Sequence, residues 1–290
     1  MSLVAAFGLS LALAASTPVQ SHQEQVEAWR KGRVERLTSP TGWLTLVGLH
    51  WIKPGINRIG NGDGVDINLG RGPAELGTLR WEGERLYFRA NGEVVTVDDQ
   101  PVLGIDLVAD SKGTPTVVKF GTAQFYVVER GGRLGLRVKD STSPVRTEFA
   151  GIDYFAIGEQ WRFEAKWEAH EPPRTMEIVT VLGDQEQIPN PGRAVFEVDG
   201  KQYALEALVE EGEERLFFIV FDATSGKQTY GSGRFFYADQ PVAGKITIDF
   251  NQAYNPPCAF TEFSTCQLPP PENRLRLAIE AGEKKYAGPH

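Results

Sequence analysis

The sequence predicts a mainly β protein in which two antiparallel β modules, of the sandwich or barrel type, follow one amphipathic helix. Breaker residues are abundant, with 31 Gly and 18 Pro among 290 residues. Between them lie short apolar runs rich in Val, Phe, Tyr and Trp, a pattern typical of short strands joined by turns. The hydrophobic fraction of 41% is sufficient for a sizeable core, and the length suits one large or two ordinary domains.

Residues 1–15 are predicted to be a signal peptide. The apolar run over residues 3–15 is too short to span a bilayer, and residues 12–14 fit a small-x-small cleavage pattern, although no Lys or Arg precedes the run. The alternative is a buried N-terminal helix. We therefore expect an exported protein, periplasmic or extracellular, with no integral membrane segment in the mature chain.

An amphipathic helix is predicted over residues 21–39. Ser21 and Glu24 have the spacing of a capping box, and Pro40 ends the run. Four apolar side chains fall near one face of this helix, namely Val26, Trp29, Val34 and Leu37. The other face interleaves both charges, which favours a solvated surface over a basic binding surface, and it comprises Glu27, Arg30, Lys31, Arg33, Glu35 and Arg36.

Residues 41–139 are predicted to form the first β module, residues 140–160 a connector, and residues 161–287 the second β module. Hairpin turns are expected at Asn91-Gly92 and at Asp199-Gly200. The continuously apolar residues 216–221 predict a central strand buried on both faces. Other strands of the second module are expected over residues 161–169, 174–181, 194–198, 202–208, 229–237, 245–250 and 275–280, with an irregular loop over residues 251–274.

The start of the first module resembles a forkhead-associated domain, a β-sandwich that binds phosphothreonine. The resemblance lies in Gly55-Ile-Asn-Arg-Ile-Gly60 and Val65-Asp-Ile-Asn-Leu69. Asn61 stands where that family has its binding Arg, and Arg71-Gly72-Pro73 replaces the expected Ser and His. The resemblance therefore implies the sandwich fold but not phosphopeptide binding, which needs an anion-binding side chain at this loop.

The second module resembles a prokaryotic family called domain of unknown function 1684. Its signature is similar to Asp249-Phe-Asn-Gln-Ala-Tyr-Asn-Pro-Pro-Cys-Ala-Phe260 and to Thr265-Cys-Gln-Leu-Pro-Pro-Pro-Glu-Asn-Arg-Leu275. Gly42-Trp-Leu-Thr-Leu-Val-Gly-Leu-His-Trp51 and Tyr230-Gly-Ser-Gly-Arg234 also fit, so the resemblance runs from about residue 40 to residue 287. This family implies no established activity.

The loop over residues 251–274 is the predicted binding region. Long loops in compact domains are usually functional or disordered, and five prolines and three aromatic rings make this one too apolar for disorder. Its polar side chains are expected to converge on a small polar or anionic ligand, unless they satisfy the loop's own backbone. The ligand-binding candidates in and beside the loop are Tyr230, Arg234, Asn251, Tyr254, Asn255, Asn273 and Arg274.

Two further arginines, Arg137 and Arg146, are candidates for bidentate binding of an anionic group. The alternative is that they pair with Asp140, Glu148 or Asp153 near the connector. The backbone N–H groups of the Gly-Ser-Gly turn before Arg234 form a candidate anion cradle, although a plain bend explains the glycines equally well.

Cys258 and Cys266 are the only cysteines. In an oxidising compartment a pair favours a disulfide, which chain entropy values at about 2.6 kcal/mol for so short a loop. Inert buried thiols and a reactive Cys258 are the alternatives, and a nucleophile needs a base nearby. Two sulfurs are too few for a structural zinc site, so no metal is predicted.

Other function classes lack sequence support. The formal net charge of −8 argues against binding to nucleic acid or to an anionic membrane surface. His170-Glu171 lacks the second His of a zinc-binding helix and precedes two prolines. No Gly-x-Ser-x-Gly elbow, phosphate loop or dinucleotide fingerprint occurs, so no cofactor is predicted. His50 is expected to be hydrogen-bonded and partly buried, with a general base as the alternative.

Three functions therefore remain open. The first is binding of a small polar or anionic molecule in a cleft of the C-terminal β module. The second is hydrolysis in the same cleft, with Asp249 or Glu272 as the acid–base residue and Cys258 as a less favoured nucleophile. The third is a non-catalytic structural or partner-binding protein of the cell envelope.

Overall fold

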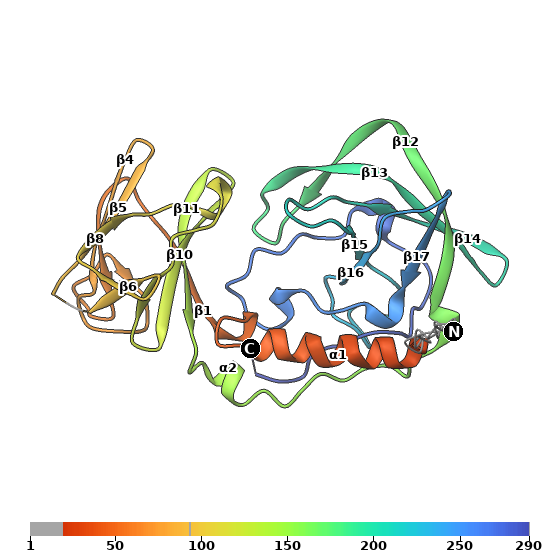
Figure 1. Ribbon diagram of the computed structural model, residues 1–290, viewed down its shortest axis with the longest axis horizontal. Coiled ribbons are helices and arrows are strands. Elements are labelled where there is room, and N and C mark those ends of the chain that lie inside the picture. The colour runs from red at the N-terminus through yellow and green to blue at the C-terminus, as the bar shows by residue number, and fades with distance from the viewer. Residues whose placement is uncertain (1–19, 93, 290) are drawn as a thin grey trace, which may run out of the picture.

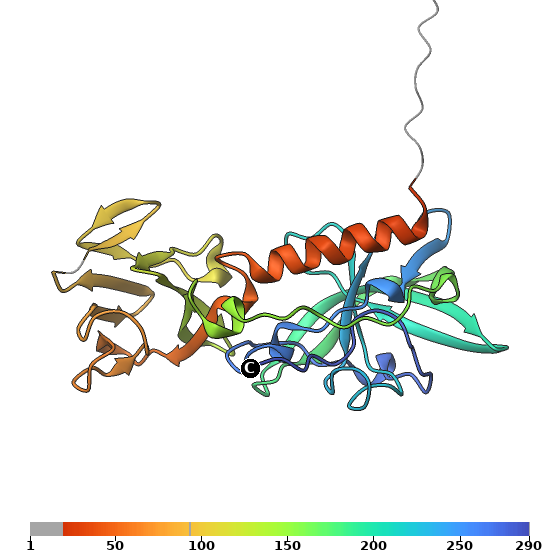
Figure 2. The same cartoon turned by 90° about the horizontal axis from the view of Figure 1, so that it is seen from below.

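The computed structural model describes residues 20–92 and 94–289, so the predicted signal peptide lies outside the described residues. The protein is mainly β behind one N-terminal helix, as predicted. The two β modules follow each other along the longest axis, and helix α1 (His22–Thr38) runs beside the second module toward the first (Figures 1 and 2). Within the described residues, no helix is long and apolar enough to cross a membrane.

Helix α1 begins where the sequence predicts because its capping box forms. The Glu24 N–H donates to Ser21 Oγ at 3.2 Å, and the Ser21 N–H donates to the Glu24 carboxylate at 2.7 Å. Val26 and Leu37 are buried on the face toward the protein. The sequence therefore encodes both the start of the helix and its packed face.

The charged face of α1 differs from the prediction because Arg33 is buried. Its Nε pairs with Glu283 at 3.0 Å, and its Nη2 donates to Asn255 O at 2.8 Å. Arg30 is also half-buried and donates to Phe155 O at 2.9 Å. These two arginines fasten the helix to the connector and to the C-terminal segment, so this face is not simply solvated.

The first module is a sandwich of two sheets with an apolar core. Phe88 and Phe125, one from each sheet, pack edge to face with ring centroids 5.4 Å apart. The six-stranded sheet comprises, in spatial order, β1 (Leu46–Trp51), β11 (Arg133–Asp140), β10 (Ala123–Arg130), β9 (Val118–Phe120), β6 (Val95–Val97) and β7 (Gln100–Val102). The five-stranded sheet comprises β3 (Ile67–Asn68), β2 (Gly55–Gly60), β4 (Gly77–Glu82), β5 (Arg85–Ala90) and β8 (Gly104–Asp106). Strands β2 and β3 are parallel, and the other pairs are antiparallel.

The connector contains one short helix, α2 (Pro144–Thr147), and then runs beside α1 (Figures 1 and 2). Arg146 on α2 donates from Nε to Thr38 O at 2.8 Å and from Nη1 to Ser141 O at 2.8 Å. A cation at the carbonyl end of a helix satisfies orphan acceptors. Arg146, a predicted ligand-binding residue, thus holds the C-terminal end of α1.

The second module combines a four-stranded sheet with a two-stranded one. The first comprises, in spatial order, β14 (Lys201–Ala207), β13 (Gln185–Val198), β12 (Arg162–Val179) and β17 (Lys245–Asp249). The second pairs β15 (Leu216–Val220) with β16 (Arg234–Ala238). Every residue of β15 is buried, as predicted, because alternate side chains enter two separate apolar clusters. However, β15 belongs to a sheet of only two strands.

Three expected elements of the second module differ from the structure. The two strands expected around Pro172-Pro173 form one long β12, whose ladder with β13 skips from Ala169 to Arg174. Strand β16 begins at Arg234, because residues 231–233 form a turn. No strand forms over residues 275–280, where the carbonyls of Ile279 and Ala281 accept hydrogen bonds from a buried guanidinium instead of a neighbouring strand.

Short 3-10 helices occur at several joints. They are η1 (Trp43–Thr45), η2 (Asp110–Lys112), η3 (Glu159–Trp161), η4 (Phe250–Gln252), η5 (Pro257–Ala259) and η6 (Pro271–Asn273). Three of them lie in the long loop of the second module, and η1 directly precedes β1. The loop is therefore an ordered, locally wound segment.

Candidate functional site

A cleft of about 830 Å³ lies where α1, the first module and the second module meet, and we call it the inter-module cleft. Its walls include five arginines, three glutamates and several aromatic rings. Arg36 and Trp43 line it from α1 and η1, Arg130 and Arg137 from the first module, and Tyr237, Tyr254, Thr265 and Cys266 from the second. The site is thus built by both modules, whereas the sequence placed it in the second alone.

Arg137 on β11 is a buried cation in this cleft, with only 4% of its surface exposed. Its Nη2 donates to Thr265 Oγ1 at 3.0 Å, and its Nε has no hydrogen-bond partner among the described residues. No carboxylate of the described residues pairs with it. The neighbouring Arg130 also donates to Thr265 Oγ1, at 3.2 Å, but pairs with Asp110 at 2.8 Å. Arg137 alone of these two lacks a counter-charge.

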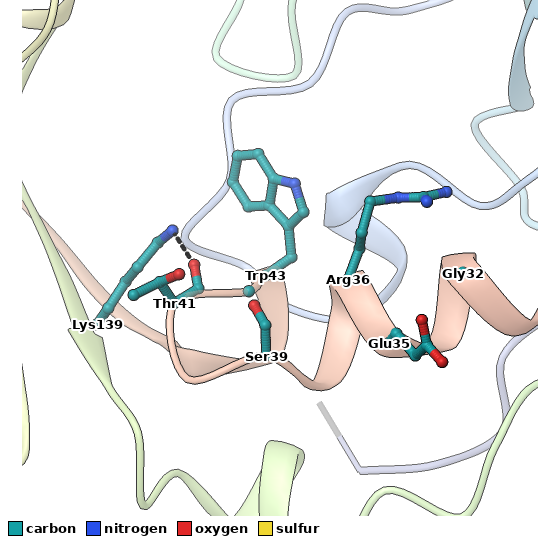
Figure 3. A pocket seen from close by; sticks show the side chains of 8 residues that line it. Gly32, Glu35, Arg36, Ser39, Thr41, Trp43 and Lys139 are labelled. Atoms are coloured by element: carbon teal, nitrogen blue, oxygen red, sulfur yellow. Dashed lines mark hydrogen bonds between the residues drawn. The ribbon is translucent and has the colours of Figure 1, made fainter.

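A smaller hollow of about 460 Å³ adjoins the cleft and shares Arg36 and Trp43 with it. Figure 3 shows the Trp43 indole with Arg36 on one side and Lys139 on the other. The Lys139 ammonium donates to Thr41 O at 2.6 Å, and burial together with the charge of Arg137 lowers the pKa of Lys139 to about 8. Arg36 forms no ion pair with any described residue. Three cations without carboxylate partners therefore surround Trp43.

The second-module wall of the cleft combines aromatic rings with one protected carboxylate. Tyr237 donates to Glu210, and burial raises the pKa of Glu210. The ring of Tyr254 stacks on that of Tyr237 with centroids 6.4 Å apart, and the Arg33 guanidinium lies 4.5 Å from the Tyr254 ring centre. Burial raises the pKa of both tyrosines, so they remain neutral donors at ordinary pH.

Cys258 and Cys266 are free thiols in the structure, in contrast to the predicted disulfide. The Cys258 N–H donates to Cys266 Sγ at 3.2 Å, and Ser264 Oγ lies 3.5 Å from the same sulfur. Hydrogen bonding with the Cys258 thiol, aided by Ser264 and by the charge of Arg137, lowers the pKa of Cys266. The same thiol–thiol hydrogen bond and burial raise the pKa of Cys258. Cys266, not Cys258, lines the cleft.

Arg234 does not reach the cleft, because its side chain is fully buried at the start of β16. Its Nη2 pairs with Asp222 at 2.8 Å and donates to Ile279 O at 2.9 Å, while its Nη1 donates to Ala281 O. These contacts attach the C-terminal segment to the second module. The predicted anion-binding guanidinium therefore occupies an internal, structural position.

The three predicted asparagines are also fully buried and satisfy backbone groups. Asn251 exchanges hydrogen bonds of 2.9 Å with both the N–H and the C=O of Gly158. Asn273 does the same with Glu206, at 2.7 and 3.0 Å. Asn255 donates to a carbonyl of the C-terminal segment at 2.8 Å. The structure corrects the expected convergence of these amides. It also differs from the stated alternative, because their partners Gly158, Glu206 and Lys284 lie outside the loop, so these amides attach the loop to other segments.

The two predicted catalytic carboxylates lie apart from the cleft. Asp249 accepts a hydrogen bond from the Asn251 N–H at 3.0 Å, and its other oxygen lies 2.7 Å from His22 Nε2. Glu272 is exposed. The structure does not bring them together with the inter-module cleft, whose lining includes neither.

Of the four remaining ligand-binding candidates, two line the cleft and two do not. Tyr254 and Arg137 line the cleft. Tyr230 donates to Cys258 O at 2.9 Å, and burial raises the pKa of Tyr230 to about 12. Arg274 is exposed, with its guanidinium 5.0 Å from the ring centre of Phe221.

The two histidines of the chain's body differ in their contacts. His50 Nε2 is buried without a hydrogen-bond partner among the described residues, and desolvation lowers the pKa of this ring. The expected hydrogen bond of His50 is therefore absent from the described part of the chain. His170 Nε2 lies 2.7 Å from Glu206. Neither histidine lines the inter-module cleft.

Sequence reasoning missed several residues of the cleft, for a physical reason in each case. Arg36 follows Glu35 in a helix of mixed charge, and Lys139 lies in the charged end of a strand beside Asp140. Both sequence patterns are also typical of solvent-exposed surfaces. Glu210 opens the acidic, Gly-containing run of residues 210–214, which is typical of an exposed turn. Trp43 stands in an apolar run, a pattern that predicts burial in a core rather than a place in a binding site. Their grouping depends on docking between the modules, which no local spacing encodes.

Comparison with known proteins places the chain in a family. Residues 147–284 match the family described as Protein of unknown function (DUF1684), and the chain belongs to this family. The match covers the connector and the second module, whereas residues 42–51 lie outside it. No curated protein matches the chain.

Two solved structures are similar to parts of the chain. One is a solution NMR structure of an uncharacterised protein of Haloarcula marismortui, with 32% identity and a TM-score of 0.41, covering 48% of this chain and 78% of that one. The other is the FhaA FHA domain complexed with the intracellular domain of Rv3910, with 17% identity and a TM-score of 0.22, covering 31% of this chain and 97% of that one.

Proposed function

We propose that this protein binds a small anionic molecule in the inter-module cleft, with Arg137 as the main anchor. The observation that carries this proposal is a guanidinium only 4% exposed that pairs with no described carboxylate. Taking an ion out of water costs several kcal/mol unless a counter-charge and hydrogen bonds compensate. An anion in the cleft supplies that compensation.

Two other buried arginines, Arg33 and Arg234, stabilise the fold, and each of them pairs with a carboxylate. Arg234 pairs with Asp222 at 2.8 Å, and Arg33 pairs with Glu283 at 3.0 Å. Arg137 has the hydroxyl of Thr265 and the rings of Trp43 and Tyr126, whose centres lie 5.5 and 6.0 Å from its guanidinium carbon, but no carboxylate among the described residues. A guanidinium offers a planar fork that matches a carboxylate or phosphate in a bidentate way. The free Nε of Arg137 is therefore the group we assign to an oxyanion.

The surroundings of Arg137 suit an anion with an aromatic or other planar body. Arg36 and Lys139 add positive charge on either side of Trp43. Trp43 and Tyr254 add ring surface within a volume of about 830 Å³, in the range typical of small-molecule sites. Three glutamates in the lining oppose a highly charged ligand. A monoanionic or dianionic aryl compound fits this balance.

Calorimetric titration tests this proposal with phenyl phosphate and benzoate as the probes. We expect saturable binding to the wild-type protein and at least about 30-fold weaker binding to Arg137→Met, because losing one partner of a buried charge pair costs about 2–5 kcal/mol. Arg58→Met is the matched control, because Arg58 lies on β2 and forms an exposed ion pair with Asp66. Equal affinities for wild type and Arg137→Met contradict the proposal, as does an absence of binding to the wild type.

Hydrolysis is a second candidate function, and one observation favours it: Glu210 lies in the cleft with a raised pKa and a hydrogen bond from Tyr237. A carboxyl group whose pKa is raised above its usual value is better suited to act as a general acid beside a bound anion. On this proposal Glu210 takes the role that the sequence gave to Asp249 and Glu272. Release of 4-nitrophenol from nitrophenyl esters or phosphates by the wild type but not by Glu210→Gln supports it, and equal rates contradict it.

A further inference from the structure

The long loop of the second module brings the two cysteines into one small polar site. Cys258 lies in η5, and its N–H donates to Cys266 Sγ at 3.2 Å. Both backbones are held from outside the loop, because the Val181 N–H donates to Cys266 O at 2.8 Å and the Tyr230 hydroxyl donates to Cys258 O at 2.9 Å. The two sulfurs therefore face each other in a fixed frame.

The two thiols have different surroundings. Cys266 Sγ accepts a hydrogen bond from the Cys258 N–H at 3.2 Å and donates one to Ser264 Oγ at 3.5 Å, and the charge of Arg137 favours its ionised form. Such an environment favours a thiolate, the nucleophilic form of cysteine. Both sulfurs contact the same apolar cluster, but the hydrogen bond with Cys266 and burial raise the pKa of Cys258, so Cys258 keeps its proton more firmly. These surroundings favour Cys266 as the attacking thiolate and Cys258 as the thiol that reacts second.

Access to the pair runs through the inter-module cleft. Cys266 lines the cleft of about 830 Å³ although it is only 8% exposed, whereas Cys258 is the more exposed of the two but does not line the cleft. A reagent that enters the cleft therefore meets Cys266 first. The cleft volume is in the range typical of small-molecule sites.

We propose that Cys266 is a reactive thiolate that exchanges with low-molecular-weight disulfides entering the cleft, and that Cys258 completes the exchange by forming an intrachain disulfide. The Cys266 thiolate attacks one sulfur of the small disulfide, so that a protein–small-molecule mixed disulfide forms and one small thiolate leaves and takes up a proton. Cys258 then loses its proton and attacks Cys266 Sγ, which releases the second small thiol. The protein loses two electrons and two protons, and the small disulfide gains them.

This inference stands apart from anion binding, because it concerns the sulfurs and holds whether or not an anion occupies the cleft. It also differs from the structural disulfide expected from sequence. A structural disulfide is formed once and kept, whereas on this proposal the two thiols, which are free in the structure, are oxidised by exchange. Both lead to a Cys258–Cys266 disulfide. The proposal adds that Cys266 reacts first and Cys258 second.

The test begins with fully reduced protein and hydroxyethyl disulfide, a neutral reagent, followed by intact mass spectrometry and thiol titration. We expect the wild type to lose both titratable thiols and to retain no adduct. Cys258→Ser should accumulate one mixed disulfide at Cys266, and Cys266→Ser should react at least about 10-fold more slowly, as a buried thiol without stabilising donors does. Equal rates for the two single variants, or a stable adduct on the wild type, overturn the proposal.

A second measurement keeps the proposal testable even if a variant fails to fold. Brief alkylation of the reduced wild type with iodoacetamide, followed by peptide mapping, should label Cys266 well before Cys258. The midpoint of the pH dependence should lie below that of a free cysteine, about 8.5, and should move upward in Arg137→Met. Preferential labelling of Cys258, or a midpoint that does not move in Arg137→Met, contradicts the assigned roles.

Discussion

Two regions of this molecule bury an arginine almost completely, and they treat its charge in opposite ways. Beneath the C-terminal segment, Arg234 pairs with Asp222 and donates to main-chain carbonyls. In the inter-module cleft, Arg137 donates to one hydroxyl and pairs with no carboxylate of the described residues, whereas the Nε of both arginines lacks a partner there. Burial alone therefore does not identify a functional residue. The difference lies in the carboxylate partner: an arginine that has one stabilises the fold, and an arginine that lacks one is a candidate for binding an anionic ligand.

The largest expected effect is the loss of stability on replacing Arg234, the arginine that pairs with a carboxylate. Arg234→Met leaves Asp222 buried without its partner, which should lower the free energy of unfolding by about 3–5 kcal/mol. Urea denaturation measures this loss, with Arg58→Met as the surface control, expected to stay within about 0.5 kcal/mol of wild type. A loss below about 1 kcal/mol would show that the Arg234 contacts do not hold the second module together.

The next prediction concerns the other arginine. Arg137→Met removes a buried charge that lacks a carboxylate partner, so stability should stay level or rise. Affinity for phenyl phosphate should fall by at least about 30-fold in the same variant. Denaturation and calorimetry on one preparation separate the two quantities. If Arg137→Met is destabilised as strongly as Arg234→Met, the two arginines are equivalent and the contrast is wrong.

A pH titration sharpens the account of the cations around Trp43. The pKa of Lys139 is about 8 in the free protein, and a bound anion raises it, so affinity is full below pH 8 and falls as the pH rises above 8. The expected fall is up to about tenfold per pH unit. The lowered folded-state pKa makes stability rise with pH between about 8 and 10.5, so unfolding does not explain the loss. Lys139→Met should abolish the slope, and an unchanged slope in this variant would exclude Lys139 from the site.

The smallest effect tests the carboxylate that the sequence placed in the site. Asp249 caps η4 and contacts His22, so Asp249→Ala should cost about 1–2 kcal/mol of stability. Its affinity for phenyl phosphate should equal that of wild type, because Asp249 is not part of the cleft lining. Thermal unfolding and calorimetry provide the two readouts. Loss of binding with unchanged stability would return Asp249 to the binding site.

Local patterns predicted the architecture well and the site only in part. The capping box at Ser21, the hairpin at Asp199-Gly200 and the burial of β15 all follow from spacing within a few residues. The loop amides are ordered as expected, but Asn251 and Asn273 bind backbone carbonyl and N–H groups rather than a ligand. Residue type shows that such a side chain forms hydrogen bonds, but it does not identify the partner.

The cleft escaped prediction because it depends on contacts between distant parts of the chain. Arg137 meets Thr265 across 128 residues, and Arg33 meets Glu283 across 250. The strand expected over residues 275–280 also depends on distant contacts, since the Ile279 carbonyl accepts a hydrogen bond from Arg234 and the Leu277 carbonyl accepts one from the Ala223 N–H. Arg137 was identified as a candidate from its chemistry, but its lack of a counter-charge was visible only in the packed structure.

Nuclear magnetic resonance of the arginine side chains tests the central claim most directly. The Nε–Hε signal of Arg137 is assigned by its disappearance in Arg137→Met, and phenyl phosphate is then titrated into the wild-type protein. We predict a saturable shift of this signal with the same Kd as calorimetry gives, while the Arg234 signal stays in place. Saturable binding that leaves the Arg137 signal unmoved would show that the anion lies elsewhere, and the account of the inter-module cleft would be wrong.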